Sequence, residues 1–322
     1  MRARLLSLII TNLIINTANA HYFTDVSIHD VGYDLNYFTI PANVGENTGA
    51  FHDNGSTAYH VAASSGNSAY VDLSINGTLL SDNVTWATSN PGIGIQYRFD
   101  SPADFVPSWS ETAPNYRLDM PHSPGVTTSY FHLRYRLVRL LEKIPAGKIT
   151  SLPQVTLRVH NPEGEGTSLI SGVILSNITS NLKVTACGID APSEIKLPTL
   201  YGNTIQNGAL NVTEAPTVTL TNCPGAVDGI SYNFSAVYGT HNAANGVLNT
   251  ESGDGYAQNV YIQVQNTDGT PHIVNGSIPL SDYNGSGDYK IPDFKVAYFV
   301  DDAESVTAGN VKSAIELKVT YN

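Results

Sequence analysis

The sequence has few of the residues on which metal sites, disulfide scaffolds and nucleic-acid interfaces depend. Its 322 residues include only two cysteines, and 28 acidic residues outnumber 16 lysines and arginines. Nucleic-acid binding requires a concentrated basic surface, so this balance argues against such a partner. After the first twenty residues, no apolar run approaches the length of a membrane-spanning helix.

Two hydrolase motifs are also absent. The sequence contains no Gly-x-Ser-x-Gly nucleophile elbow and no His-Glu-x-x-His zinc pair. Glu163 and Glu165 lie together in a glycine-rich turn, which is a poor frame for the opposed carboxylates of a glycosidase. We therefore predict that the protein is not an enzyme and uses no cofactor.

Residues 1–20 have the pattern of a secretory signal peptide. Arg2 and Arg4 provide a basic start, an apolar stretch follows, and Ala18 and Ala20 are the small residues that precede a cleavage site. A membrane anchor is the alternative, but polar residues interrupt a stretch that is already short for a bilayer. We predict export with cleavage before His21, which leaves a net charge of −14.

The composition of the remainder is that of a sheet protein. Thr, Asn, Gly, Ser, Val and Tyr are common, whereas helix formers such as Lys and Glu are sparse. Alternating apolar and polar residues predict strands at residues 70–75, 92–97, 155–159, 218–220 and 260–265. Asn76-Gly77 and Asp268-Gly269 favour tight turns, and the first pair predicts a hairpin.

Residues 131–141 fit two patterns. The leucines have the spacing of a helix, but Leu133, Tyr135 and Leu137 also alternate as they would in a strand. Because all the surrounding segments favour strands, we predict a strand that is followed by a turn at residues 144–147.

Both cysteines, Cys187 and Cys223, lie in the second half of the chain. Two cysteines in an exported protein usually form a disulfide, and closing a loop of this length stabilises the fold by about 4 kcal/mol in the chain-entropy model. Two buried free thiols are the alternative.

The first half differs from the second in carrying both tryptophans, Trp86 and Trp109, and no cysteine. A polar stretch near residues 178–186 separates the two halves and is a candidate hinge. We predict a signal peptide at residues 1–20, an N-terminal domain at 21–180 and a C-terminal domain at 184–322.

The last residues form the most informative pattern. Ile315, Leu317, Val319 and Tyr321 alternate with polar residues, and Gly309 is the fourteenth residue from the end. Residues 195–198, Ile-Lys-Leu-Pro, follow the first cysteine. In these features the sequence resembles the pilin domains of chaperone–usher fimbriae, in which a disulfide joins the first two strands.

The resemblance implies two immunoglobulin-like β-sandwich domains, the C-terminal one an incomplete pilin-type sandwich that lacks its last strand. The missing strand is then supplied by a periplasmic chaperone and later by the next fimbrial subunit, through donor-strand complementation at an outer-membrane usher. Ile315, Leu317, Val319 and Tyr321 are the expected contacts of that strand. A complete sandwich, closed by its own last strand, is the alternative.

A whole predicted domain precedes Cys187, where ordinary fibre subunits carry a short donor peptide. This arrangement resembles two-domain tip adhesins, whose first domain is a lectin, and residues 133–161 look like the end of such a domain. The resemblance implies export to the periplasm, display outside the cell at the fimbrial tip, and binding of a host or surface glycan. Because the first domain lacks cysteine, unlike mannose-binding type 1 tip adhesins, mannose specificity is not implied.

Two stretches of the first half offer the carboxylates, amides and aromatic rings that sugar sites need. One begins at residue 51, and the other is a proline-rich stretch after residue 100, where an Asp-Ser pair resembles one used by GlcNAc-binding adhesins. The predicted ligand-binding residues are His52, Asp53, Asp100, Ser101, Trp109 and Tyr116. The alternative is that Trp109 anchors a loop on the core and Asp100 caps a turn.

His52, His60, His122 and His132 raise the question of zinc, but no two of them have tight ligand spacing, so we predict no metal. Two further functions remain open at this point. One is a secreted carbohydrate-active enzyme with two β-domains, and the other is a structural fimbrial subunit that binds no sugar.

Overall fold

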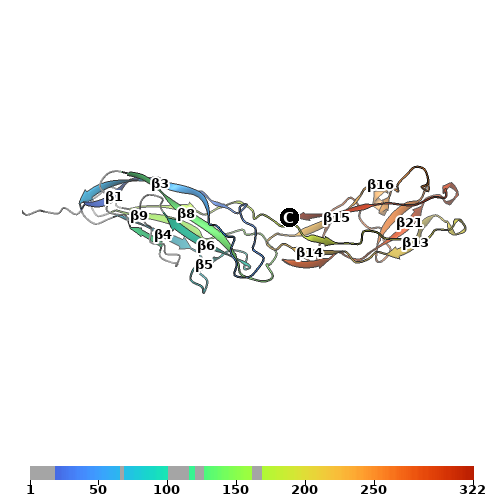
Figure 1. Ribbon diagram of the computed structural model, residues 1–322, viewed down its shortest axis with the longest axis horizontal. Helices are drawn as coiled ribbons and strands as arrows, with labels where there is room; N and C mark the ends of the chain where they lie inside the picture. Colours follow the sequence, from blue (N-terminus) through green and yellow to red (C-terminus); the bar gives the residue numbers. More distant parts are fainter. Residues whose placement is uncertain (1–18, 66–68, 101–115, 120–126, 162–168) are drawn as a thin grey trace, which may run out of the picture.

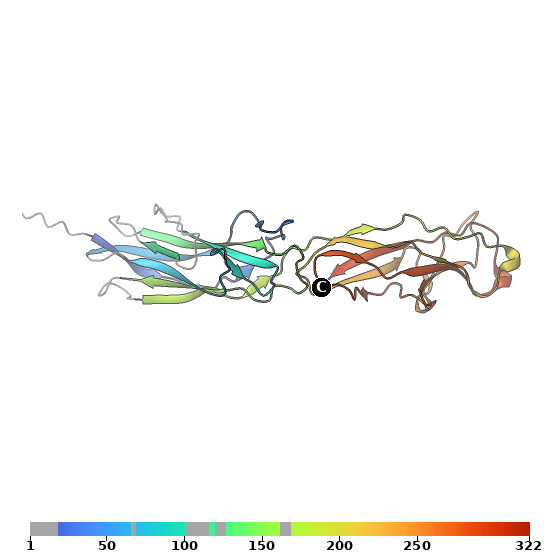
Figure 2. The same cartoon turned by 90° about the horizontal axis from the view of Figure 1, so that it is seen from below.

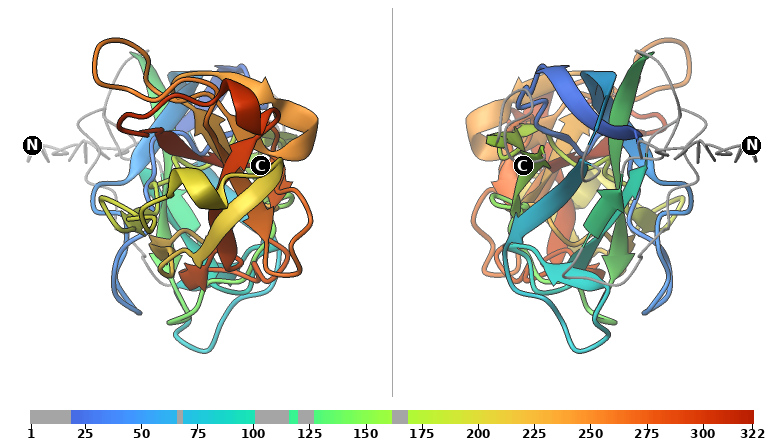
Figure 3. Two further views of the ribbon diagram at one scale, coloured as in Figure 1. Left: turned by 90° about the vertical axis from the view of Figure 1, so that its right-hand side faces the viewer. Right: turned by 90° about the vertical axis from the view of Figure 1, so that its left-hand side faces the viewer.

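The computed structural model describes residues 19–65, 69–100, 116–119, 127–161 and 169–322. They form two β-sheet lobes that lie end to end, with the N-terminal half of the chain in one lobe and the C-terminal half in the other (Figures 1 and 2). A view along the long axis places one lobe in front of the other (Figure 3). The described residues contain no α-helix, and their short helical turns are far from spanning a membrane. The predicted all-β fold is confirmed.

Two sheets pack against each other in the N-terminal lobe, in the strand orders β1-β3-β8-β6-β5 and β10-β9-β4-β7. Their bounds are β1 (Asn19–Val26), β3 (His52–Ser65), β8 (Thr127–Arg139), β6 (Ile93–Asp100), β5 (Thr85–Ala87), β10 (Leu169–Leu175), β9 (Gln154–His160), β4 (Tyr70–Asn76) and β7 (Tyr116–Asp119). Side chains from both sheets, among them Tyr97 and Leu157, share one core. A small parallel sheet pairs β2 (Tyr33–Asp34) with β11 (Ile178–Ser180), so β11 belongs to this lobe.

Strand β8 includes most of residues 131–141, for which the sequence fitted both a helix and a strand, so the predicted strand is confirmed. Leu133, Tyr135 and Leu137 are buried in the core, whereas Arg134 and Arg136 are only half-buried. This period of two places the apolar residues on the inner face and the arginines on the outer face of the sheet.

The predicted hairpin at Asn76-Gly77 is wrong, because β4 pairs with β7 and β9 in one sheet while the next strand, β5, belongs to the other sheet. Gly77 serves packing instead, since a Cβ there would lie 2.8 Å from the Pro153 Cγ atom. The tight turn in this region comes later, where Asn83 has a φ of 60° and its N–H donates to the Leu80 carbonyl. The turn predicted at Asp268-Gly269 is confirmed, with φ of 87° at Gly269.

The C-terminal lobe contains three sheets with the orders β12-β14-β20, β13-β21-β18-β17-β16 and β19-β15-β22. Their bounds are β12 (Gly188–Asp190), β14 (Thr219–Cys223), β20 (Gly287–Lys290), β13 (Gly208–Glu214), β21 (Phe294–Val300), β18 (Tyr261–Asn266), β17 (Val247–Leu248), β16 (Thr240–Asn242), β19 (Ile278–Pro279), β15 (Ile230–Ala236) and β22 (Ile315–Tyr321), with 3-10 turns η1 (Gly202–Thr204), η2 (Ala243–Asn245) and η3 (Ala303–Ser305). The predicted disulfide between Cys187 and Cys223 is confirmed. It ties the start of β12 to the end of β14, which are paired strands.

The two lobes meet at the turn formed by residues 144–148. Backbone hydrogen bonds cross the junction from Ala226 N–H to the Pro145 carbonyl (2.9 Å), from Gly147 N–H to the Val227 carbonyl (2.8 Å) and from Ser286 N–H to the Ile144 carbonyl (2.7 Å). These bonds satisfy backbone groups of both lobes, so the junction is a structured contact rather than a loose tether.

Ile144 is the centre of this contact. Its side chain is 2% exposed, and it lies against Gly225 and Gly285 of the C-terminal lobe and Gly92 of its own lobe. A Cβ atom at Gly225 or Gly285 would overlap the Ile144 carbonyl oxygen. The two glycines are therefore what allows the backbones of the two lobes to approach each other.

A charged contact flanks the turn. The Asp228 carboxylate accepts a hydrogen bond from the Lys148 N–H (3.1 Å) and lies 3.3 Å from the Lys148 Nζ atom. The bond from the Lys148 N–H is the main cause that lowers the pKa of Asp228 below the ordinary aspartate value. The charged contact is therefore fully present above that ordinary value and is lost as the pH falls through the lowered one.

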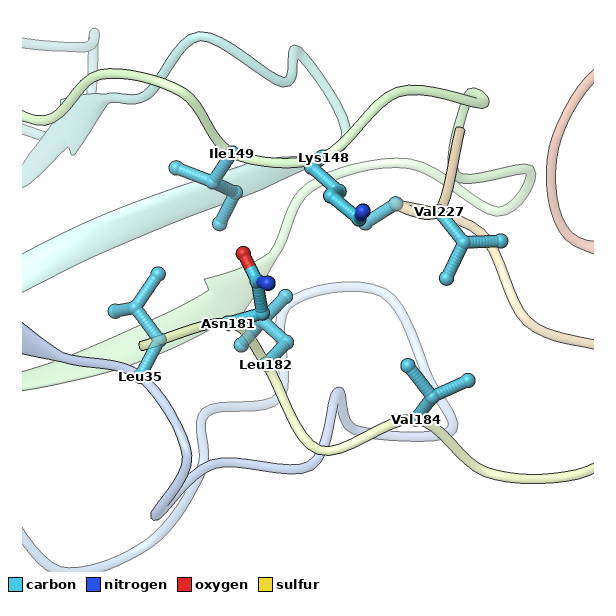
Figure 4. A pocket seen from close by; sticks show the side chains of 8 residues that line it. Leu35, Lys148, Ile149, Asn181, Leu182, Val184 and Val227 are labelled. Atoms are coloured by element: carbon cyan, nitrogen blue, oxygen red, sulfur yellow. The ribbon is translucent and has the colours of Figure 1, made fainter. Parts of the chain in front are cut away.

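A small cavity of about 20 Å³ lies beside this contact. Figure 4 shows its lining, in which Leu35 and Ile149 of the N-terminal lobe face the connecting residues Leu182 and Val184 and the C-terminal residue Val227. Its walls are mainly apolar, so it contributes to the packing of the junction.

We expect the substitution Gly225→Ala to loosen the junction. The added methyl group would overlap the Ile144 carbonyl, and such overpacking costs about 1–3 kcal/mol. Small-angle X-ray scattering should then show a more variable separation of the lobes, and proteases should cut the 144–148 turn faster. Gly202→Ala is the matched control, since a Cβ there meets nothing within 4 Å. Identical behaviour of the two variants would contradict the tight contact at Ile144.

Candidate functional site

The last strand of the chain has an unpaired edge. β22 pairs antiparallel with β15 on one side, and on its other side no strand of the fully described stretch 169–322 pairs with it. The C-terminus lies at the centre of the molecule, beside the junction, so this edge runs along the C-terminal lobe toward the N-terminal lobe (Figure 1). An edge of this kind exposes backbone donors and acceptors to an incoming strand.

The side chains of β22 show that the core is also open along this edge. On β15, Ile230, Tyr232 and Phe234 are 2–3% exposed. Their direct partners on β22, Tyr321, Val319 and Leu317, are only partly buried although they pack on the same core. Residues that face each other across two paired strands normally share one environment. The contrast therefore indicates that cover is missing over β22. We call Ile315, Leu317, Val319 and Tyr321 the open edge.

Other partly buried apolar residues belong to the same core. Ile195 and Leu197, in the irregular segment between β12 and η1, are among them. The Tyr321 hydroxyl accepts a hydrogen bond from the Cys187 N–H (2.6 Å), which ties the end of β22 to the start of β12. Residues 195–198, which resemble a segment of pilin domains, thus contribute side chains to the core that is open along β22.

Gly309 sets the bend that leads into β22. A Cβ there would overlap backbone atoms of Tyr256 and Ala257, so only glycine permits this approach. The neighbouring Asn310 carbonyl accepts from the Ala257 N–H (2.9 Å), and the Asn310 N–H donates to the Gly255 carbonyl (2.8 Å). These contacts fix the position at which β22 starts.

The second candidate site is the outer face of the N-terminal sheet, across β3, β8 and β6. The backbone of His132 on β8 pairs with Ser56 on β3 and with Asp100 on β6. The Asp53 carboxylate contacts the His132 Nδ1 atom, lies 3.4 Å from the Arg134 Nε atom and accepts from the Gly55 N–H (3.0 Å). The structure therefore brings the predicted residues Asp53 and Asp100 to adjacent parts of one sheet.

His52, the neighbour of Asp53, points the other way. Its ring stacks on Tyr37 at 3.8 Å between centroids and meets the edges of Phe38 and Tyr135. Tyr37 is 68% exposed, which makes it an accessible aromatic ring. Sequence reasoning did not select Tyr37, because nothing in its local sequence indicates that it stacks on His52.

The remaining predicted ligand residues are separated from this cluster. The Tyr116 side chain is 3% exposed and belongs to the core of the N-terminal lobe, a position that does not favour ligand contact. Ser101 and Trp109 lie outside the described residues. Within the part of the chain that the structure describes, no three His, Cys, Asp or Glu side chains come together as a metal site.

The comparisons with known proteins bear on the C-terminal lobe first. Residues 176–322 match the family described as fimbrial protein, a span that contains the disulfide, Gly309 and the open edge. This part of the chain is a fimbrial-protein domain. The predicted C-terminal pilin domain is thus confirmed. No curated protein matches the chain.

Solved structures give three further similarities. The chain is similar to the CupB6 tip adhesin of Pseudomonas aeruginosa, at 18% identity over 94% of this chain and 95% of that chain, with a TM-score of 0.43. An antigen and type I fimbria protein of Burkholderia pseudomallei matches at 23% identity over 43% of this chain and 91% of its own, with a TM-score of 0.30. The P pilus rod subunit PapA matches at 18% identity over 44% of this chain and 95% of its own, with a TM-score of 0.32.

The open edge leads to a stability prediction for the fimbrial domain. Leu220 and Leu317 pack on one core, but Leu220 is fully buried and Leu317 is not. We expect Leu220→Ala to lower the free energy of unfolding by about 2–5 kcal/mol and Leu317→Ala to lower it by less than half as much. Denaturant unfolding of the two full-length variants measures the difference. Equal losses would mean that β22 is already covered.

Proposed function

We propose that the protein is the tip adhesin of a chaperone–usher fimbria, joined to the fibre by its fimbrial domain and bound to a glycan by its N-terminal lobe. The observation that carries the proposal is a fimbrial domain with an open edge that directly follows a folded β-sandwich. The open edge is suited to a strand donated by a periplasmic chaperone and then by the next subunit.

The segment before the fimbrial domain supports a position at the tip. β11 pairs in parallel with β2, and the Lys183 N–H donates to the Phe38 carbonyl (3.0 Å), so these residues are held by the N-terminal lobe. A segment committed in this way is not available as a donor strand for a neighbouring subunit. The fimbrial domain then receives a strand from its neighbour and gives none from this segment.

Assembly is tested on the open edge itself. Tyr321→Ala removes the ring at the end of the apolar row and the hydrogen bond to Cys187, at a cost of about 2–4 kcal/mol of contact with a donated strand. We expect a lower periplasmic level and loss of surface display in the producing cell. Thr320→Ala, on the outer face of the same strand, should assemble normally. Normal display of the Tyr321→Ala variant would contradict the proposed strand exchange.

Glycan binding is tested on the N-terminal lobe. Asp100 ends β6 beside β8, and we expect Asp100→Asn to abolish binding to a glycan array with little change in melting temperature, because residues at strand ends contribute less to the core than residues within it. Asp254→Asn, an exposed change in the fimbrial domain, is the control. Undiminished binding by the Asp100 variant would move the site elsewhere, and turnover of the bound glycan would favour the enzyme alternative.

A further inference from the structure

The outer face of β22 carries two opposite charges beside the open edge. Glu316 and Lys318 alternate with the apolar residues of the row, and their side chains are 61% and 56% exposed. The Lys318 Nζ atom lies 3.2 Å from the Glu316 Oε2 atom, so the two side chains contact each other while the edge is open. The outer face of this strand therefore presents one negative and one positive position in a fixed order.

The strand on the paired side of β22 offers these charges no counterpart. Glu316 is directly opposite Ser235 on β15, and Lys318 is directly opposite Asn233. Serine and asparagine are neutral, so neither forms a cross-strand charge pair. On the other side, no strand of residues 169–322 pairs with β22. A strand added there can place charged side chains directly opposite Glu316 and Lys318, with Cβ atoms about 5 Å apart.

A second incompletely covered stretch of the same core has the same pattern. Residues 194–197 are Glu-Ile-Lys-Leu, and residues 316–319 are Glu-Leu-Lys-Val. In both stretches the apolar side chains pack on the core while the charged ones are exposed, and the Lys196 Nζ atom lies 3.7 Å from the Glu194 carboxylate. The buried strand β15 has Ser and Asn at the positions opposite the outer residues of β22. Alternating charge therefore accompanies the uncovered part of this core.

Solubility of the free edge does not account for this arrangement. One glutamate and one lysine add no net charge, so they add nothing to the repulsion between copies of an acidic protein. A lysine alone would already discourage two such edges from pairing. Two opposite charges in a fixed order instead favour one kind of partner strand and disfavour the reverse, because like charges directly opposite each other destabilise a sheet.

We propose that Glu316 and Lys318 select the strand that the neighbouring subunit donates. On its outer face that strand carries a basic side chain opposite Glu316 and an acidic side chain opposite Lys318. This inference rests on the proposed function and adds the chemistry of the partner strand. The subunit's strand has to displace the chaperone's strand from the same edge, and two cross-strand charge pairs favour that step.

The test adds a strand to the full-length chain itself. Each extended chain continues from Asn322 through a Gly/Ser linker of about four residues into a strand with an alternating apolar row. β22 has seven residues and is about 23 Å long, so this linker is too short to return along it, and the added strand can only lie antiparallel. Opposite Lys318 and Glu316, the matched chain has Glu and Lys, the reversed chain has Lys and Glu, and the neutral chain has Thr at both positions.

We expect all three extensions to raise the melting temperature, and the matched chain to melt about 2–6 °C above the reversed chain. The neutral chain should lie between them, and the difference should shrink as salt is raised. The exchange Glu316→Lys with Lys318→Glu should reverse the order of the matched and reversed chains. The exchange Lys290→Asp with Asp293→Lys is the control, because this exposed pair of the same domain lies away from β22, and it should leave the order unchanged.

The producing cell separates the neighbouring subunit from the chaperone. In the chain without an extension, the exchange of Glu316 and Lys318 should leave the periplasmic level unchanged and lower surface display severalfold, because the chaperone still covers the edge while the subunit's strand meets two like charges. A fall in the periplasmic level would assign the charges to the chaperone's strand and overturn their assignment to the subunit. Unchanged level and display would overturn the selection of either strand.

The melting temperatures also distinguish failure of this proposal from failure of the proposed function. If the three extensions stabilise the chain equally, selection by charge is overturned and strand exchange at the open edge stands. If none of them raises the melting temperature above that of the unextended chain, the edge accepts no added strand, which overturns the proposed strand exchange and this proposal with it.

Discussion

The structure of the C-terminal domain depends on the open edge of β22, the apolar row that lacks a covering strand within residues 169–322. Ile230, Tyr232 and Phe234 of β15, which has strands on both sides, are buried, whereas β22 has a neighbouring strand on one side only within residues 169–322. A strand in this position must present a strict alternation, since a slip of one residue would turn Glu316 and Lys318 toward the core. The register is fixed at both ends before any partner arrives, by the close approach at Gly309 and by the hydrogen bond between Cys187 and Tyr321. The open edge therefore lacks a covering strand, but the register of β22 against β15 is already fixed.

The end of β22 also meets the junction between the lobes. The Asn322 N–H donates to the Gly229 carbonyl (2.9 Å), and the Asn322 carbonyl accepts from the Asp228 N–H (2.8 Å). Asp228 in turn holds Lys148 of the N-terminal lobe. A strand added along β22 would thus end beside the residues that join the lobes. Because the junction rests on backbone hydrogen bonds and the buried Ile144, the N-terminal lobe is held in a defined orientation relative to that strand.

Local patterns predicted the features that depend on local chemistry. Period-two alternation located the strands around residues 70–76 and 93–100 and the last strand, and the cysteine pair predicted the disulfide. The open edge was implied by the resemblance to pilin domains, not by the alternation itself. The failures concern contacts between distant residues. Gly77 packs on Pro153 instead of turning a hairpin, and the 144–147 turn contacts residues some 80 to 140 positions further along the chain. Such pairings depend on the register between strands, which a single sequence does not specify.

The arginines on the outer face of β6 and β8 also show that a single sequence does not reveal which charged side chains lie opposite each other. Alternation alone places arginines outside the core, where their long stems cover apolar surface, so each looks ordinary in the sequence. Only the pairing of β6 with β8 sets Arg98 against Arg134.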